Sequence, residues 1–280
     1  GGFKYADEVE PSGANFRRPY FTIMNSQRIF VSYLTIVRRE VYRFFRIWTQ
    51  TMLPSVVTSV LYFLIFGAFI GSQVKPINGV SYMQFIVPGL VMMAVITNAF
   101  QNVVGSFFGA KFMKNIEELM VSPTPSWVII AGYTTGGVLR GVVVGGIVLL
   151  VSIFFTSLSI LHPFLIILFM ILTALLFSLA GLFNALFAKN FDQISIIPVF
   201  VLTPLTYLGG VFYSVTTLPP LWQNLSYFNP ILYMVNGFRY GFSGFSDVNV
   251  AASLVILMVL NLLLAYIDWR LIEKGTGLKN

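Results

Sequence analysis

The sequence predicts an all-α membrane protein with six transmembrane helices, and three observations lead there. Of 280 residues, 57% are hydrophobic and 10% are charged, whereas soluble domains carry about 25% charged residues. Long stretches without Asp, Glu, Lys or Arg follow one another along the chain. Basic residues border these stretches, a pattern that indicates membrane topology rather than nucleic-acid binding.

Crossing about 30 Å of hydrocarbon takes about 20 helical residues. The uncharged runs and the turn signals between them therefore predict six spans. We expect them at about 50–71, 83–108, 127–154, 163–188, 193–213 and 249–269.

The uncharged run 193–238 is too long for one crossing. It contains three dipeptides that break regular structure, namely Gly209-Gly210, Pro219-Pro220 and Asn229-Pro230. We expect one crossing followed by a re-entrant pair of short helices, near 219–227 and 230–243. Non-helical backbone at membrane depth is tolerated only where protein buries it or where it lines water.

The basic residues orient the spans. An even number of crossings places both termini on one side, and from Arg28 onward eleven basic residues lie there against two on the other. The eleven are Arg28, Arg38, Arg39, Arg43, Arg46, Lys111, Lys114, Lys189, Arg270, Lys274 and Lys279, and the two are Lys75 and Arg239. The positive-inside rule makes the first side cytoplasmic, so the re-entrant pair is expected on the outer side. No apolar run precedes residue 47, so the first span is expected to be the anchor in place of a cleavable signal peptide.

The residues before the first span fall into two parts. Residues 1–26 are polar and poorly periodic, which predicts a disordered tail or a leader left from expression. Residues 27–48 combine apolar residues at helical spacing with an arginine cluster close to Phe44, Phe45 and Trp48. That composition is typical of a helix lying in the membrane interface. A cytosolic extension of the first span is the alternative.

The sequence lacks the residues that several classes of function require. No carboxylate lies between Glu40 and Glu117 or between Glu118 and Asp192, which disfavours a proton-coupled carrier. His162 is the only histidine and there is no cysteine, so neither a metal site nor a catalytic triad is expected. The chain has no G-x-x-x-x-G-K-[ST] phosphate-binding loop, so we expect no catalytic residues and no ATP hydrolysis of its own.

Arg140 is the charge inside the third predicted span. It lies among glycines that recur every four residues, a pattern that lets helices approach closely: Gly132, Gly136, Gly137, Gly141 and Gly145. Because Arg140 projects toward the same side as Gly137 and Gly141, it is expected to face protein. Two interpretations stay open: a contact to an anionic substrate group or a gate, and a structural arginine bonded to neighbouring helices or reaching the cytoplasmic surface.

Two spans carry polar side chains at helical spacing. The second has Asn98, Gln101, Asn102 and Ser106, and the fifth has Thr203, Thr206 and Tyr207 near Pro204. Such side chains either line a pathway or hydrogen-bond helices to one another, and the sequence leaves both interpretations open.

The stretch LTPLTYLGGVFYSVTTLPPLWQNLSYFNPILYMVNGFR (Leu202–Arg239) resembles the signature of ABC-transporter permeases of the type-2 exporter family. The spacing agrees at Leu202, Leu205, Leu208-Gly209, Val211, Leu218-Pro219, Pro230-Ile231, Tyr233 and Arg239. Two further stretches, GLVMMAVITNAF (89–100) and EELMVSPTP (117–125), look like that family's second span and the loop after it. The resemblance covers about 28–275.

The resemblance implies a single transmembrane permease domain over 27–275, in a bacterial inner (cytoplasmic) membrane. Two copies would pair around a central path with two cytosolic ABC ATPase subunits. ATP and Mg would bind to the ATPase, and this chain would hold no cofactor. The homodimer would move an amphiphile, a lipid-like molecule, a drug or a glycan outward by alternating access. Membrane lipids would be its other partners, and no nucleic acid is expected.

The resemblance also makes Lys111–Ser122 a cytoplasmic coupling helix that docks on the ATPase. An apolar face of Ile116, Leu119 and Met120 agrees with this role, and Pro123 and Pro125 would end the helix. The residues expected to carry the contact are Lys114, Glu117, Glu118, Leu119 and Pro123. A short solvated loop is the alternative. By the same resemblance, 27–48 would be a connecting helix and 214–245 an outer re-entrant cap.

Two other function classes stay open. One is an ATP-independent membrane facilitator or channel, and the other is a non-transporting membrane scaffold. Replacing Glu118 by Lys separates them from an exporter, because only an exporter would lose ATPase coupling.

Overall fold

The computed structural model describes residues 25–71, 73, 74, 76, 77, 79–116, 118 and 122–278. These residues form a bundle of helices with no β-strand among them; an isolated bridge joins Ile77 to Val80. The predicted tail falls outside the described residues except for its last two positions. The all-α prediction is confirmed.

Five helical stretches are long and apolar enough to cross a membrane. They are Trp48–Gly67, which comprises α2 (Trp48–Thr51), α3 (Leu53–Tyr62) and the start of the π-helix η1 (Phe63–Ile70), then α4 (Tyr82–Phe112), α6 (Ser126–Ser152), α7 (Pro163–Phe187) and α12 (Val250–Glu273). Each coincides closely with a predicted span, because long uncharged apolar runs are a local property of the sequence.

The predicted span 193–213 is shorter in the structure. It corresponds to α8 (Phe191–Ile197), the π-helix η2 (Pro198–Leu202) and α9 (Thr203–Tyr207), which make up one apolar stretch of 17 residues. The helix ends at Tyr207, and Gly210 then takes a φ of +71°, a conformation that glycine adopts at little cost. The prediction of a helix reaching residue 213 is therefore wrong.

Three other helices lie where helices that do not span the membrane are predicted. Helix α1 (Ser26–Arg46) matches 27–48, and α10 (Pro220–Tyr227) and α11 (Pro230–Ser243) match the two short helices after the break. Pro220 and Pro230 each occupy the first turn of their helix, where the missing N–H costs nothing.

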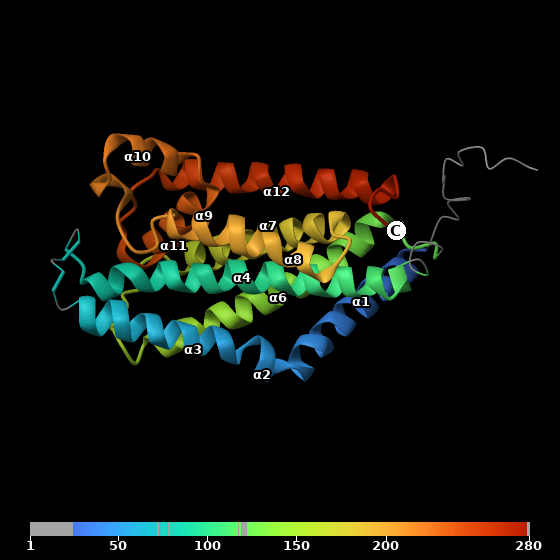
Figure 1. Cartoon of the computed structure of the whole chain (residues 1–280), viewed down its shortest axis with the longest axis horizontal. Helices are drawn as coiled ribbons and strands as arrows, with labels where there is room; N and C mark the ends of the chain where they lie inside the picture. Colours follow the sequence, from blue (N-terminus) through green and yellow to red (C-terminus); the bar gives the residue numbers. More distant parts are fainter. Residues whose placement is uncertain are drawn as a thin grey trace, which may run out of the picture.

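Helix α4 is the centre of the bundle and packs against both α6 and α7. Figure 1 shows α4 running the length of the molecule, with α1 to α3 on one side and α7 to α12 on the other. Helix α12 packs on α7 and α11, and α1 packs on α6. Glycines allow the close approaches: a Cβ on Gly181 of α7 would lie 2.6 Å from the carbonyl oxygen of Phe100 of α4.

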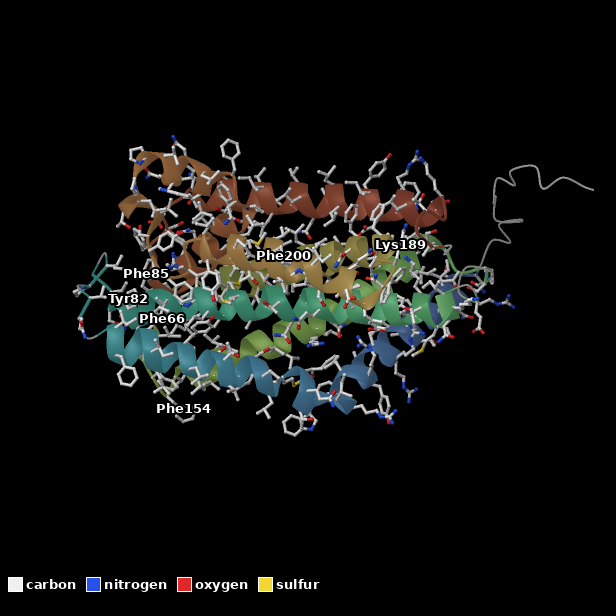
Figure 2. All side chains as sticks on the ribbon, in the orientation of Figure 1. Phe66, Tyr82, Phe85, Phe154, Lys189 and Phe200 are labelled. Carbon is white, nitrogen blue, oxygen red and sulfur yellow. The ribbon has the colours of Figure 1, made fainter. Side chains whose placement is uncertain are left out.

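The two ends of the bundle differ. One end holds the start of α1, the chain segment after α4 and the C-terminus, and α10, α11 and the connection before α4 lie at the other (Figure 1). Figure 2 places Lys189 toward the first end and Tyr82 and Phe85 toward the second. We call the first the basic end, because Lys114, Lys189 and Lys274 lie there.

Candidate functional site

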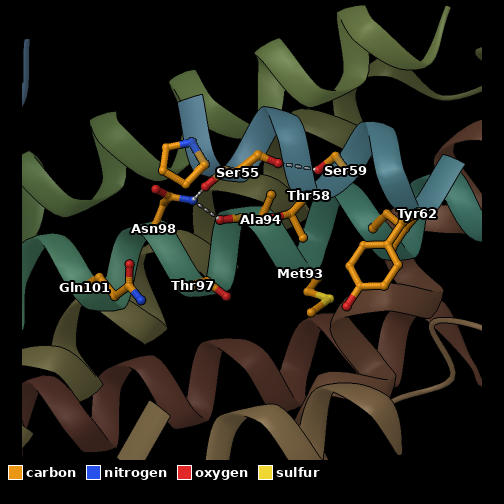
Figure 3. Close-up of a pocket in the computed structure, with 11 residues that line it drawn as sticks. Ser55, Thr58, Ser59, Tyr62, Met93, Ala94, Thr97, Asn98 and Gln101 are labelled. Carbon is orange, nitrogen blue, oxygen red and sulfur yellow. Dashed lines mark hydrogen bonds between the residues drawn. The ribbon is translucent and has the colours of Figure 1, made fainter. Parts of the chain in front are cut away.

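A groove of about 240 Å³ runs between α3 and one side of α4 (Figure 3). Its walls are Pro54, Ser55, Thr58, Ser59 and Tyr62 from α3, and Leu90, Met93, Ala94, Thr97, Asn98 and Gln101 from α4. Apart from the phenol of Tyr62, the polar side chains are hydroxyls and amides. Small-molecule sites usually enclose about 300 to 1,000 Å³, so this groove has the size of one part of a larger site.

Two of the predicted pathway residues line this groove. Gln101 is exposed on the open side of α4, and Asn98 is buried in the wall. The Nδ2 of Asn98 donates to Ser55 Oγ at 2.8 Å and to the Ala94 carbonyl at 3.0 Å, and Figure 3 shows both bonds. Asn98 therefore joins α3 to α4 and lines the groove at once.

Arg140 of α6 lies behind Asn98, outside the groove wall. The side chain is buried, and its guanidinium donates to Asn98 Oδ1 at 3.1 Å. The expectation that Arg140 faces protein is confirmed. Its partner is a neighbouring helix and not the cytoplasmic surface.

The other polar candidates bond within the protein. Asn102 is buried and accepts from Arg43 through both its side-chain oxygen and its carbonyl. Thr203 and Thr206 donate to carbonyls of their own helical stretch, at 2.9 Å and 2.6 Å. These hydroxyls are therefore occupied by backbone.

An aromatic cluster closes the groove toward the end of the bundle that holds α10 and α11. The hydroxyls of Tyr62 and Tyr207 are 2.9 Å apart, and the ring of Phe212 packs against Tyr62, Phe66 and Tyr207. This cluster ties α3 and η1 to α9 across the groove. The π-helix η1 belongs to this cluster, and the π-helix η2 directly precedes α9; π-helical turns are frequent at functional positions in helices.

A second polar cluster ties α1 to the bundle. Glu40 is fully buried on α1 and accepts from Arg43 at 2.9 Å and from Ser106 of α4 at 2.5 Å. Arg39 donates to the hydroxyl of Tyr133 on α6. Since Asn102 also bonds to Arg43, this cluster lies directly behind the α4 turn that presents Gln101 to the groove.

The predicted coupling segment begins later than expected. Lys111 still belongs to α4 and is buried, where its ammonium donates to the carbonyls of Leu186 and Ala188 at 2.8 Å each. It therefore caps the end of α7. Lys114 takes a φ of +61°, which separates α4 from the next turn.

Beyond this break, Asn115, Ile116 and Glu118 have helical backbone. Glu118 is exposed and its carbonyl accepts from the Ser122 N–H at 3.0 Å. Pro123 follows in a bend. Glu117 and Leu119 lie outside the described residues, and so does Met120. A surface groove of about 490 Å³ lies between this segment and α1.

Residues of the family signature hold α11 in place. Arg239 is 1% exposed and donates to the carbonyls of Phe85 at 3.2 Å and Gly210 at 2.7 Å, with its guanidinium 3.8 Å from the centre of the Phe85 ring. The Tyr233 hydroxyl donates to the Tyr227 carbonyl at 2.8 Å, and Pro219 is the N-cap of α10. These contacts join α11 to α4 and α10.

Sequence reasoning did not identify Glu40, Arg43 and Tyr62 as parts of these clusters. Their only local signal is a lone acid inside an arginine-rich helix and a tyrosine in an apolar span. Among the described residues, no group of three or more His, Cys, Asp or Glu could hold a metal ion.

Comparison with known proteins identifies a family that this chain matches. Residues 31–243 match the sequence model of the ABC-2 type transporter family. The chain is 56% identical over 250 residues to the inner membrane transport permease YadH of Escherichia coli (strain K12), covering 89% of this chain and 98% of YadH. Nodulation protein J of Rhizobium leguminosarum bv. viciae is 22% identical over 233 residues, covering 82% of this chain and 89% of that protein.

Proposed function

The chain belongs to the ABC-2 type transporter family and is a membrane subunit of a transporter, and from this we propose that it is the permease half of an ATP-driven exporter. Two copies pair, and each docks on a cytosolic ATPase that binds ATP and Mg. The pair moves an amphiphilic or lipid-like molecule, a drug or a glycan out of the cytoplasm or the inner leaflet.

The observation that carries this proposal is the uncovered polar groove on the central helix. Most of α4 is buried, yet Thr97 and Gln101 open onto the groove. The neighbouring stretch Phe191–Tyr207 carries no fully buried residue except Thr206. A second copy placed against this face would enclose a path lined by both grooves and would cover the apolar side chains beside them.

The proposal fixes the topology. Phe191–Tyr207 is the fifth of six crossings, and both termini are cytoplasmic at the basic end. Helix α1 lies in the interface with Arg28, Arg38 and Arg46, which are exposed, toward anionic head groups. Helices α10 and α11 re-enter the membrane from the outer side and cap the path.

The coupling segment after Lys114 connects the motor to the path. Closure of the ATPases on ATP pushes this segment against α1, and the cluster of Glu40, Arg43 and Asn102 passes the movement to α4. The groove then opens alternately to the two sides, with no chemical step in this chain.

The test is affinity purification of the chain from native membranes in mild detergent, followed by mass spectrometry. We expect a P-loop ATPase in stoichiometric amount. Glu118→Lys reverses a charge on the coupling segment and should lose the ATPase, whereas Arg38→Gln on the exposed side of α1 should keep it. Repeated absence of any ATPase while the permease stays paired would favour a passive facilitator.

A further inference from the structure

Arg140 is a buried charge without a carboxylate partner in the described part of the chain. It is 6% exposed, and the ion pairs found among the described residues are Arg39–Glu40 and Arg43–Glu40. A buried charge usually has an ionic partner or a full set of hydrogen bonds. Its guanidinium donates a hydrogen bond to Asn98, and its Nε has no partner in the described residues.

This single bond fixes the orientation of the Asn98 amide. A guanidinium can only donate hydrogen bonds, so the amide must turn its oxygen toward Arg140 and its nitrogen toward Ser55. Ser55 Oγ accepts that N–H at 2.8 Å. The hydroxyl proton of Ser55 therefore stays available to donate to a group in the groove.

The charge also makes the electrostatic potential of the groove more positive. The groove wall carries no carboxylate, so nothing in it offsets the positive charge behind Asn98. Where water is scarce, such a charge acts over several ångströms. A cation entering the groove would be repelled. An anion would lose its hydration without a direct cationic contact in return.

We propose that Arg140 is a positioning residue that makes the groove accept an uncharged hydrogen-bond acceptor and reject cationic amphiphiles. The inference deepens the proposed function, because it names the chemistry of the substrate group that enters the path. Arg140 does not touch the ligand; it orients the donor of Ser55 through Asn98 and supplies the repulsion.

The test uses two photoactivatable probes with the same diazirine-bearing alkyl chain and different head groups. One head group is glucosyl, which is uncharged and rich in acceptors, and the other is trimethylammonium. The full chain is reconstituted in nanodiscs of neutral phosphatidylcholine, so that lipid charge does not concentrate either probe. Mass spectrometry counts the cross-links within residues 90–101.

We expect the glucosyl probe to label these residues at least tenfold more than the cationic probe. Arg140→Gln, which keeps an amide donor for Asn98 and removes the charge, should lower that ratio to about threefold or less by admitting the cation. Ser55→Ala should lower glucosyl labelling by about threefold or more and leave cationic labelling low. Ser253→Ala, on α12 away from the groove, is the matched control and should change neither.

Equal labelling by the two probes, preference for the cation, or no labelling of the groove would overturn the proposal. So would an unchanged ratio in Arg140→Gln. If Arg140→Gln does not fold, the ratio of glucosyl to cationic labelling in the wild type and the result for Ser55→Ala still test the proposal. No ATPase is needed, so a failure here leaves the exporter proposal standing, and a missing ATPase leaves this result standing.

Discussion

Glu40 is the buried acid that holds α1 against the bundle. Its two carboxylate oxygens accept from Arg43 and Ser106, and the residue is fully buried. Removing one partner of a buried pair leaves the other charge uncompensated, which costs more than the pair gains. The cost is moderated here because Arg43 is 32% exposed.

We therefore expect Glu40→Gln to lower the free energy of unfolding by about 2 kcal/mol. Thermal unfolding of the detergent-solubilised protein measures it as a fall in Tm. Arg38→Gln, on the exposed side of the same helix, is the control and should leave Tm unchanged. Equal Tm values for the two variants would mean that the cluster does not stabilise α1.

Arg239 of α11 joins its helix to α4 and to the turn at Gly210, at the end of the bundle opposite the basic end. Its planar guanidinium reaches two carbonyls and covers the ring of Phe85. A lysine ammonium cannot reproduce the fork geometry. Arg239→Lys should therefore lower the free energy of unfolding by about 2 kcal/mol. Arg239→Met should lower it by at least as much. A Tm for Arg239→Lys equal to that of wild type would show that the carbonyl contacts contribute nothing.

The sequence could locate the polar candidates but not their partners. Asn98, Asn102 and Arg140 are visible as polar residues in apolar spans. Their bonds to other helices join residues 42 or more positions apart, and Glu40 and Ser106 are 66 positions apart. Such pairing depends on how the helices pack, which periodicity within one helix does not determine.

At the scale of elements, the glycines of α6 divide the helix into packed and open faces. A Cβ on Gly136 would lie 2.5 Å from the Cβ of Glu40 on α1, whereas a Cβ on Gly146 would meet nothing within 4 Å. The first glycine therefore sets the approach of α1 to α6, and the second does not.

We expect Gly136→Ala to push α1 away and to lower the free energy of unfolding by about 1 to 3 kcal/mol. Gly146→Ala should be neutral, or stabilising by up to about 1 kcal/mol, because alanine favours the helix. Limited proteolysis after α1 and Tm both report the difference. If both variants behave alike, close α1–α6 packing is not what Gly136 provides.

The elements themselves could largely be predicted. Five spans follow from hydropathy, and α10 and α11 follow from their prolines. Hydrophobic periodicity does not reveal the π-helical turns of η1 and η2. Helix α9 ends at Tyr207, just before the Gly209-Gly210 break, so that break marks its end better than the predicted limit of 213 does. The predicted coupling segment starts too early, because the sequence shows Lys111 as a loop charge, yet Lys111 caps α7 from inside α4.

At the scale of the whole molecule, Lys114, Lys189 and Lys274 lie at the basic end, and the positive-inside rule predicts that this end is cytoplasmic. The chain has no cysteine, so single cysteines can report the topology directly. Ser26, Asn224 and Thr276 are exposed and lie in or near α1, α10 and the C-terminus.

With six crossings, Ser26→Cys and Thr276→Cys should react with an impermeant maleimide only in inside-out vesicles. Asn224→Cys should react only in spheroplasts. The unaltered, cysteine-free chain is the control and should not react in either. Labelling of Ser26→Cys and Thr276→Cys from opposite sides would show that Phe191–Tyr207 does not cross the membrane.

The most direct test of the exporter proposal is the native mass of the complex released from membranes in mild detergent. We predict two copies of this 31.3 kDa chain together with two copies of a P-loop ATPase, and loss of the ATPase in Glu118→Lys with the pair of permeases intact. A single permease, or a pair that never carries an ATPase, would contradict the account.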